Sequence, residues 1–241
     1  MNPTERFEGR ADAYRIGRPS YGPEVIGYVL DGLGAAPTIA DLGAGTGIAS
    51  RLLAAYGANV IAIEPNAKMR AQAEPNERVR FVEAPAESTG LADGSVDGIT
   101  AFQAFHWFAN DAALAEIVRI GRAGATAALV LNERDERDPV SAAYGDLVRR
   151  FATDDTEAQR MASIVRFKAL PGIVSERVFS SEQRLGQSDL HARIDSTSYL
   201  PNAGEAATRL GRDADAFFRL VAQQGVVRLA LHTIVVRVQL P

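Results

Sequence analysis

The segment 38–64 constrains the fold of this chain more than any other stretch. A short apolar run, 38–42, leads into a glycine-rich turn, and a stretch with helical spacing and a second apolar run follow it. Strand, glycine turn, helix and strand in this order predict a βαβ unit whose turn binds a nucleotide. Glycines let the backbone pass close to a ligand, and Glu64, about 20 residues further on, ends the second run where it can accept hydrogen bonds from a ribose diol.

Apolar runs and helical patterns alternate along the first half of the chain. We predict further strands at 79–82, 95–102 and 125–131, and helices at 23–33, 48–56, 66–73 and 111–120. Asn66 is the expected N-cap of the third of these helices. This alternation is typical of a parallel sheet that helices cover on both faces.

The alternation of predicted strands and helices ends after the strand at 125–131. A charged loop at 132–139 precedes two predicted helices, 140–151 and 156–167. Open α/β sheets bind ligands beyond the carboxyl ends of their strands, so we expect 132–175 to be a helical insertion on the substrate side. The chain is then expected to return to the core with a strand at 177–184, helices at 188–195 and 203–224, and a strand at 226–238.

The predicted architecture is one α/β domain, 1–241, with a Rossmann-like, doubly wound, seven-stranded mixed sheet. Five strands precede the insertion and two follow it, and we expect the last strand to be antiparallel. With 46% hydrophobic and 23% charged residues, the chain has enough apolar material for a core of normal size.

Composition also sets limits on function. The formal net charge of -4 gives no general attraction to nucleic acid or anionic lipid. No cysteine is present, and the three histidines are far apart in sequence, so we expect no metal site. Residues 1–18 lack the apolar core of a signal peptide, and the longest apolar run, 123–131, is too short to cross a bilayer. We therefore expect a cytoplasmic protein with neither a nucleic-acid nor a membrane partner.

The spacing of the glycines distinguishes between cofactors. In the dinucleotide fingerprint G-x-G-x-x-G the last glycine would fall on Ile48, and no lysine follows the turn as in a Walker loop. The pattern is instead G-x-G-x-G, with Asp41 two residues before its first glycine. A carboxylate beside the turn disfavours a pyrophosphate and favours a cationic ligand. S-adenosylmethionine, with a sulfonium, an ammonium and a ribose, fits this outline, and a purely structural tight turn is the alternative.

The ordered motifs resemble those of the class I S-adenosylmethionine-dependent methyltransferases, in particular the small-molecule branch called type 11, which includes trans-aconitate methyltransferase-like proteins. The resemblance covers most of the chain. It is carried by Asp41-Leu42-Gly43-Ala44-Gly45-Thr46-Gly47, Ile63-Glu64-Pro65, Phe81-Val82-Glu83-Ala84-Pro85-Ala86-Glu87, the run from Ala101 to Phe108, the segments Phe7 to Tyr14 and Arg18 to Tyr21, and the run from Ser196 to Pro201.

The resemblance implies a class I methyltransferase fold with an N-terminal lid, 1–22, and S-adenosyl-L-methionine as cofactor, leaving S-adenosyl-L-homocysteine as product. Arg18 would hold the cofactor carboxylate through a bidentate fork, with Tyr14 closing over the ligand. Pro85 departs from the family, since many members have an acid there that contacts adenine. The implied cofactor-binding residues are Tyr14, Arg18, Asp41, Gly43, Ala44, Gly45, Gly47, Glu64, Pro65, Met69, Ala86, Glu87 and Gln103.

Methyl transfer is expected at the rim that follows the fourth strand. His106 is the candidate catalytic residue, either as a general base or as a group that orients the acceptor, and a structural role is the third possibility. Trp107 is expected to form pocket wall. The insertion supplies Arg134, Arg137 and Tyr144 as candidate substrate contacts, and the late loop supplies Tyr199.

The sequence interpretation is a methyltransferase that acts on the oxygen, nitrogen or carbon of a small-molecule acceptor by in-line displacement. No Asn/Asp-Pro-Pro-Tyr motif is present, which argues against methylation of DNA bases or of protein glutamine. A catalytically inactive cofactor-binding or interaction module with the same fold is the alternative. An NAD-dependent oxidoreductase is disfavoured by Ile48 and Asp41. The acceptor and the oligomeric state are left open.

Overall fold

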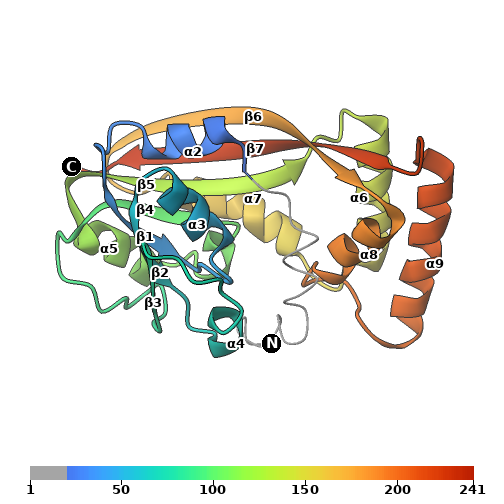
Figure 1. The fold of residues 1–241 in the computed structure, drawn as a ribbon, viewed down its shortest axis with the longest axis horizontal. Coiled ribbons are helices and arrows are strands. Elements are labelled where there is room, and N and C mark those ends of the chain that lie inside the picture. The colour runs from blue at the N-terminus through green and yellow to red at the C-terminus, as the bar shows by residue number, and fades with distance from the viewer. Residues whose placement is uncertain (1–20) are drawn as a thin grey trace. The chain divides into compact units, whose positions relative to one another are not determined.

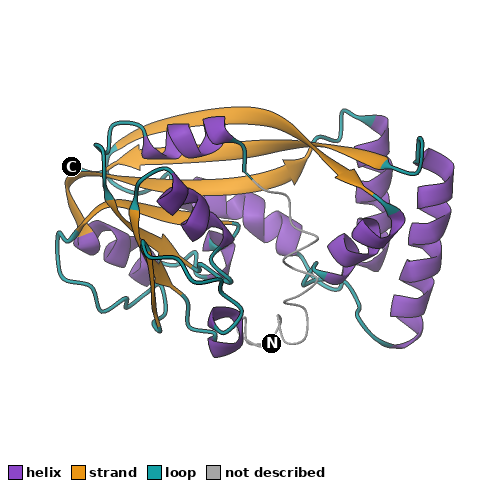
Figure 2. Ribbon diagram, viewed as in Figure 1, coloured by secondary structure: helices purple, strands orange, loops and turns teal. Residues whose placement is uncertain are grey.

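The computed structural model describes residues 21–241 and shows an α/β protein built on one seven-stranded sheet (Figures 1 and 2). The strand order is β3-β2-β1-β4-β5-β7-β6. The predictions for Tyr14, Arg18 and most of the 1–22 segment lie outside the described residues.

The first five strands form the predicted parallel part of the sheet. They are β1 (Thr38–Leu42), β2 (Asn59–Ile63), β3 (Val79–Val82), β4 (Val96–Phe102) and β5 (Gly121–Arg134). Strand β1 pairs with β2 and β4, β2 with β3, and β4 with β5, all in parallel. The short central strands are almost entirely buried, as expected for a sheet that is covered on both faces.

Strands β6 (Ile173–Leu185) and β7 (Val227–Gln239) complete the sheet. Gly124 donates a backbone hydrogen bond to Pro241, whereas Asp135 donates one to Ala230. Residue numbers therefore rise along β5 as they fall along β7, so this pair is antiparallel. The mixed sheet with an antiparallel last strand is confirmed.

Two compact units divide the chain. The sheet unit comprises Tyr21–Leu131, Glu157–Phe179 and Ile234–Pro241, and the helical unit comprises Asn132–Thr156 and Ser180–Thr233. Strands β5, β6 and β7 each contribute residues to both units.

In the sheet unit, helices cover both faces of the sheet. Helices α2 (Pro23–Leu30) and α3 (Ile48–Ala55) share an apolar cluster with strand side chains such as Ile39. Helices α5 (Asp111–Ile120) and α7 (Thr156–Phe167) share another cluster with strand side chains that alternate with the first set, such as Ala40. Alternation of neighbouring residues between two cores is the pattern of a strand buried on both faces.

In the helical unit, α6 (Pro139–Phe151), α8 (Gln187–Asp195) and α9 (Gly204–Val221) share an apolar core with the ends of β6 and β7. The expectation that the helices after β6 return to the main core is therefore wrong. Strands β6 and β7 are 13 residues long, and their ends supply Leu185, Val227 and Leu229 for these helices to pack on. Within the predicted insertion 132–175, almost all of α7 belongs to the sheet unit, whereas α6 belongs to the helical unit.

No helix within residues 21–241 is both long and apolar enough to span a membrane.

Candidate active site

The carboxyl ends of β1 and β4 mark the point at which the direction of the chain reverses across the sheet. The chain continues from β1 to β2 on one side, whereas β4, on the other side of β1, is followed by β5. Ligands of open α/β sheets bind at such a switch point. The glycine turn follows β1 there, and Gln103 follows β4, so the sheet brings two of the predicted motifs to one edge.

The glycine turn 43–47 needs glycine at three positions. Gly43, Gly45 and Gly47 have φ angles of 68°, 59° and 77°, in a backbone region that residues other than glycine rarely adopt. Gly43 and Ala44 donate hydrogen bonds to the carbonyl of Ile63, which ties the turn to the end of β2. Gly47 is the N-cap of α3. Backbone groups of the turn thus hold it between β2 and α3.

We predict that Gly43→Ala destabilises the protein far more than Gly94→Ala. Both glycines have positive φ, so both substitutions incur the left-handed strain of about 1–2 kcal/mol. A Cβ at Gly43 would also lie 2.7 Å from the Ala104 Cβ, whereas nothing lies within 4 Å at Gly94. This overpacking adds about 1–3 kcal/mol to the loss of unfolding free energy, which urea denaturation measures. Equal losses for the two variants would show that the turn is not packed as described.

Glu64 is buried directly after β2 and receives hydrogen bonds from two backbone amides. Its Oε2 accepts from Gly45 N–H at 2.9 Å, and its Oε1 accepts from Asn66 N–H at 2.8 Å. Burial raises the pKa of this carboxyl, although the two amides and Arg70 act to lower it. A carboxylate has about four acceptor sites, so after two are used it can still accept from the two hydroxyls of a ribose.

Asp41, the acidic residue before the glycine turn, is buried in β1. Its side chain accepts hydrogen bonds from the Ser50 hydroxyl on α3 at 2.6 Å and from the Thr100 hydroxyl on β4 at 2.9 Å. Burial raises its pKa to about 6, against the lowering effect of these two hydroxyls. Both carboxylate oxygens thus have protein partners, and Asp41 joins β1, α3 and β4 next to the turn. Its effect on a bound cation would act through its charge.

Thr46, within the glycine turn, is a residue that sequence reasoning missed. It is 4% exposed, and its hydroxyl has no hydrogen-bond partner among the described residues. Buried polar groups without partners are rare and call for an explanation such as a ligand. No signal in the sequence separates this threonine from a solvated one, because only the fold buries it.

The short helix α4 (Ala67–Arg70) places Met69 against the turn. Asn66 caps this helix, as predicted, by accepting hydrogen bonds from the amides of Lys68 and Met69. Met69 is buried, and a Cβ on Gly45 would lie 3.3 Å from its terminal methyl group. Pro65 is exposed. The side chain of Met69 therefore lies close to the backbone of Gly45, and its contact with a cofactor stays a prediction.

The β4 end carries Gln103 and a 3-10 turn, η2 (Phe105–Trp107). Gln103 has a φ of 54°, one of two positive values at residues other than glycine in the described chain. Strained backbone of this kind gathers at functional sites, where the surrounding structure maintains it. His106 and Trp107 follow, both half-buried, with ring centroids 4.5 Å apart. The three predicted residues of this run thus share one short segment.

The loop between β3 and β4 carries Ala86 and Glu87. Ala86 is buried in the same apolar cluster as Ala104 and Phe108, whose side chains a Cβ on Gly43 would meet. Glu87 accepts a hydrogen bond from the side chain of Asn110 at 2.9 Å. This loop therefore belongs to the same neighbourhood as the glycine turn.

The other candidate substrate residues lie in the helical unit. Tyr144 is 1% exposed and Tyr199 is 6% exposed, and both belong to the core of this unit. Burial raises the pKa of Tyr144. Arg134 lies 3.5 Å from Glu136, and exposed Arg137 pairs with Asp135. These four residues belong to the helical unit, whereas the glycine turn and Trp107 belong to the sheet unit.

Within the described part of the chain, no three His, Asp or Glu side chains are grouped so that they could hold a metal ion. The residues do fit a cofactor such as S-adenosylmethionine. The glycine turn presents backbone without Cβ atoms at three positions, Glu64 offers acceptors for a ribose, and the buried hydroxyl of Thr46 has no partner among the described residues.

Comparison with known proteins agrees with this geometry. Residues 40–129 match the family model described as a methyltransferase domain. An uncharacterized methyltransferase of Mycobacterium tuberculosis is 37% identical over 146 residues, which cover 60% of this chain and 59% of that relative. The chain therefore spans about three fifths of the length of this relative.

Solved structures show the same fold. A candidate type II methyltransferase from Anaeromyxobacter dehalogenans has a TM-score of 0.67 and 26% identity, and the match covers 93% of this chain and 99% of that one. Phosphoethanolamine N-methyltransferase 2 of Haemonchus contortus, in complex with S-adenosyl-L-methionine, has a TM-score of 0.52 and 15% identity, over 96% of this chain and 57% of that one. Residues 40–129 thus resemble a methyltransferase domain, and the chain shares its fold with solved methyltransferases.

Proposed function

We propose that this protein transfers a methyl group from S-adenosylmethionine to a small-molecule acceptor. The observation that carries the proposal is the glycine turn at the switch point of the sheet, with Glu64 bonded to the amide of Gly45. The family match supports the same cofactor. The small-molecule acceptor follows the resemblance of the motifs, and the net charge of -4 agrees with it because it gives no general attraction to nucleic acid.

The chain's own residues would bind and orient the reactants. Glu64 would accept from the ribose hydroxyls, Met69 would cover the adenine, and the backbone of the glycine turn would lie against the methionine part. S-adenosylmethionine, when bound, would supply an electrophilic methyl group on its sulfonium for in-line transfer to the acceptor, with S-adenosylhomocysteine as the leaving product. Proximity and orientation of this kind can supply about 7–11 kcal/mol of the barrier reduction.

Methyl transfer is tested by incubating the protein with methyl-labelled S-adenosylmethionine and a panel of small carboxylic acids, phenols and amines. We expect label in one acceptor class and an equal amount of S-adenosylhomocysteine. Binding of the cofactor with no transfer to any class would instead support the inactive cofactor-binding module. Labelling of protein or nucleic acid in preference to the panel would overturn the proposed acceptor.

His106 would act at the rim where the acceptor meets the methyl group. If the acceptor must lose a proton, we expect His106→Ala to lower kcat by about 10²–10⁴-fold, to leave S-adenosylhomocysteine affinity unchanged and to remove one ionisation from the pH–rate profile. If the acceptor is already a carboxylate, the substitution acts mainly on KM and the profile keeps its shape. Wild-type kcat and KM in a folded variant would leave His106 only a structural role.

A further inference from the structure

We propose that Glu116 is a positioning residue for cofactor binding, which fixes the loop between β3 and β4 onto helix α5. This loop carries Ala86 and Glu87, implied cofactor-binding residues that directly follow Pro85, the position where many members of the resembled family contact adenine. The inference therefore rests on the proposed function. Residues 83–95 contain no helix or strand, and the loop's position is therefore set by contacts with its surroundings.

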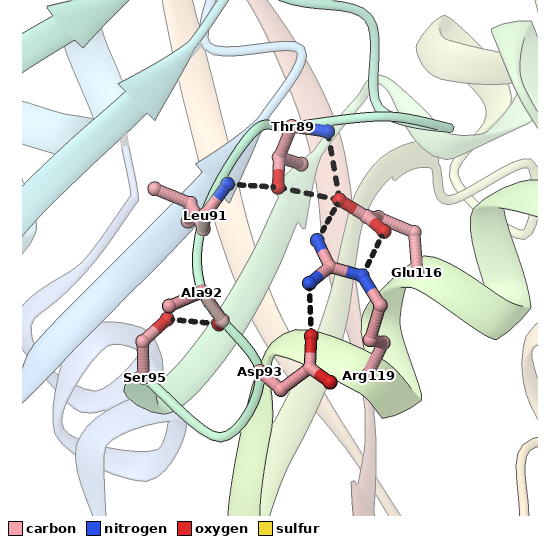
Figure 3. Close-up of polar contacts among 7 residues, drawn as sticks. All are labelled: Thr89, Leu91, Ala92, Asp93, Ser95, Glu116 and Arg119. Carbon is pink, nitrogen blue, oxygen red and sulfur yellow. Dashed lines mark hydrogen bonds and ion pairs between the residues drawn. The ribbon is translucent and has the colours of Figure 1, made fainter.

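The anchor is a buried carboxylate that accepts hydrogen bonds from both the loop and its own helix (Figure 3). Glu116 is 6% exposed, and its Oε1 accepts from the Thr89 amide at 2.7 Å and from the Thr89 hydroxyl at 2.6 Å. The same hydroxyl accepts from the Leu91 amide at 3.2 Å, so the contact fixes the loop on both sides of Thr89.

Arg119 completes the anchor one helical turn further on. Its guanidinium donates to both oxygens of Glu116, at 2.7 and 2.8 Å, and to Asp93 at 2.5 Å (Figure 3). These hydrogen bonds, led by that of Arg119, hold the pKa of Glu116 at about 2, so the carboxylate stays charged throughout the physiological range. Charge-assisted hydrogen bonds are the stronger kind, and here they fasten two points of the loop to one helix.

A second contact joins the loop to the start of α5. Asn110 caps this helix by accepting from Ala113 N–H, and its side-chain amide donates to Glu87. Asn110 comes shortly after η2, which holds His106 and Trp107. Helix α5 and its N-cap therefore hold the loop at Glu87, Thr89 and Asp93. The same helix follows the segment that carries His106, the candidate catalytic residue. A shift of the loop on this helix would displace Ala86 and Glu87 relative to the rest of the site.

Three variants test this inference. Glu116→Gln keeps an acceptor oxygen for Thr89 but places an amide group against the guanidinium of Arg119. Thr89→Val replaces the hydroxyl of Thr89 with a methyl group. Arg166→Met is the matched control. Arg166, on α7, pairs with Asp111, an exposed residue of α5 outside the loop. Calorimetry well below each melting temperature measures the affinity for S-adenosylhomocysteine and for S-inosylhomocysteine, which carries a carbonyl where adenine carries its amino group.

We expect wild type to prefer S-adenosylhomocysteine. Glu116→Gln should weaken its binding about tenfold and Thr89→Val about threefold, as losses of buried hydrogen bonds predict. The preference over the inosyl analogue should fall in both, and Arg166→Met should behave as wild type. A role in stability alone would lower the melting temperature but leave the affinities of the folded protein and their ratio unchanged.

The outcomes separate the two proposals. If wild type does not bind S-adenosylhomocysteine, the proposed function fails. If wild type binds it and the folded variants bind equally well, or lose affinity for both ligands alike, the positioning role of Glu116 is overturned. A wild type without preference for adenine would overturn it as well. Should Glu116→Gln fail to fold, the milder Thr89→Val decides.

Discussion

Glu64→Ala should weaken S-adenosylhomocysteine binding by about 1.5–3 kcal/mol, the range for hydrogen bonds to a charged group. The carboxylate is buried at the end of β2 and already orders the turn through the amide of Gly45. Its removal would take away the acceptors for the ribose and would also leave that amide without its partner. Calorimetry on the folded variant measures the loss, and urea denaturation measures the accompanying destabilisation.

Two further variants sharpen the Glu64 test. Glu64→Gln retains one acceptor oxygen and should lose less affinity than the alanine variant. Glu77→Ala removes an exposed carboxylate just before β3 and should bind as wild type does. If Glu64→Ala folds and binds S-adenosylhomocysteine with wild-type affinity, Glu64 is not the ribose ligand.

Asp41→Asn should change the pH dependence of stability. The folded-state pKa of Asp41 is about 6, compared with an ordinary value of 3.8, because burial disfavours the charged form. Ionised Asp41 therefore costs the folded state about 3 kcal/mol above pH 6, and this cost disappears as the pH falls below 3.8. The asparagine variant has no such cost, so the wild type should gain stability relative to it as the pH is lowered through this range.

Urea denaturation of both proteins at pH 7.5 and 4.5 measures this difference. Asp31→Asn is the matched control, since the Asp31 side chain is 75% exposed and its removal should leave the relative stability nearly constant between the two pH values. A wild-type–Asp41→Asn difference that does not change with pH would contradict the buried, raised-pKa carboxylate. Cofactor affinity should also fall in Asp41→Asn, because the cationic ligand loses an attracting charge.

Local signals in the sequence were sufficient for the central part of the fold. The run 38–42, the glycine turn and the run 59–63 predicted β1, the turn and β2 with correct bounds, since apolar runs and glycines report burial and left-handed backbone directly. The side chain of Asn66 caps α4 as its type predicts. Strand β6 was predicted too short, because most of its residues are exposed and give no alternating pattern.

Contacts between distant residues could not be predicted from one sequence. Asp41 takes its partner Thr100 from a strand 59 residues away, so its role as a buried link between β1 and β4 could not be predicted. Thr46 became a candidate only through its burial. Glu116 and Thr89 are 27 residues apart, and no motif joins them. The core that α8 and α9 form with α6 likewise depends on how far β6 and β7 extend, which hydrophobic periodicity does not report.

The most direct test of the central claim is calorimetric titration of the protein with S-adenosylhomocysteine and, separately, with NAD. The glycine spacing, the acidic residue before the turn and the carboxylate after β2 predict micromolar binding of S-adenosylhomocysteine at one site per chain and no binding of NAD. Tight binding of NAD with no binding of S-adenosylhomocysteine would contradict the account.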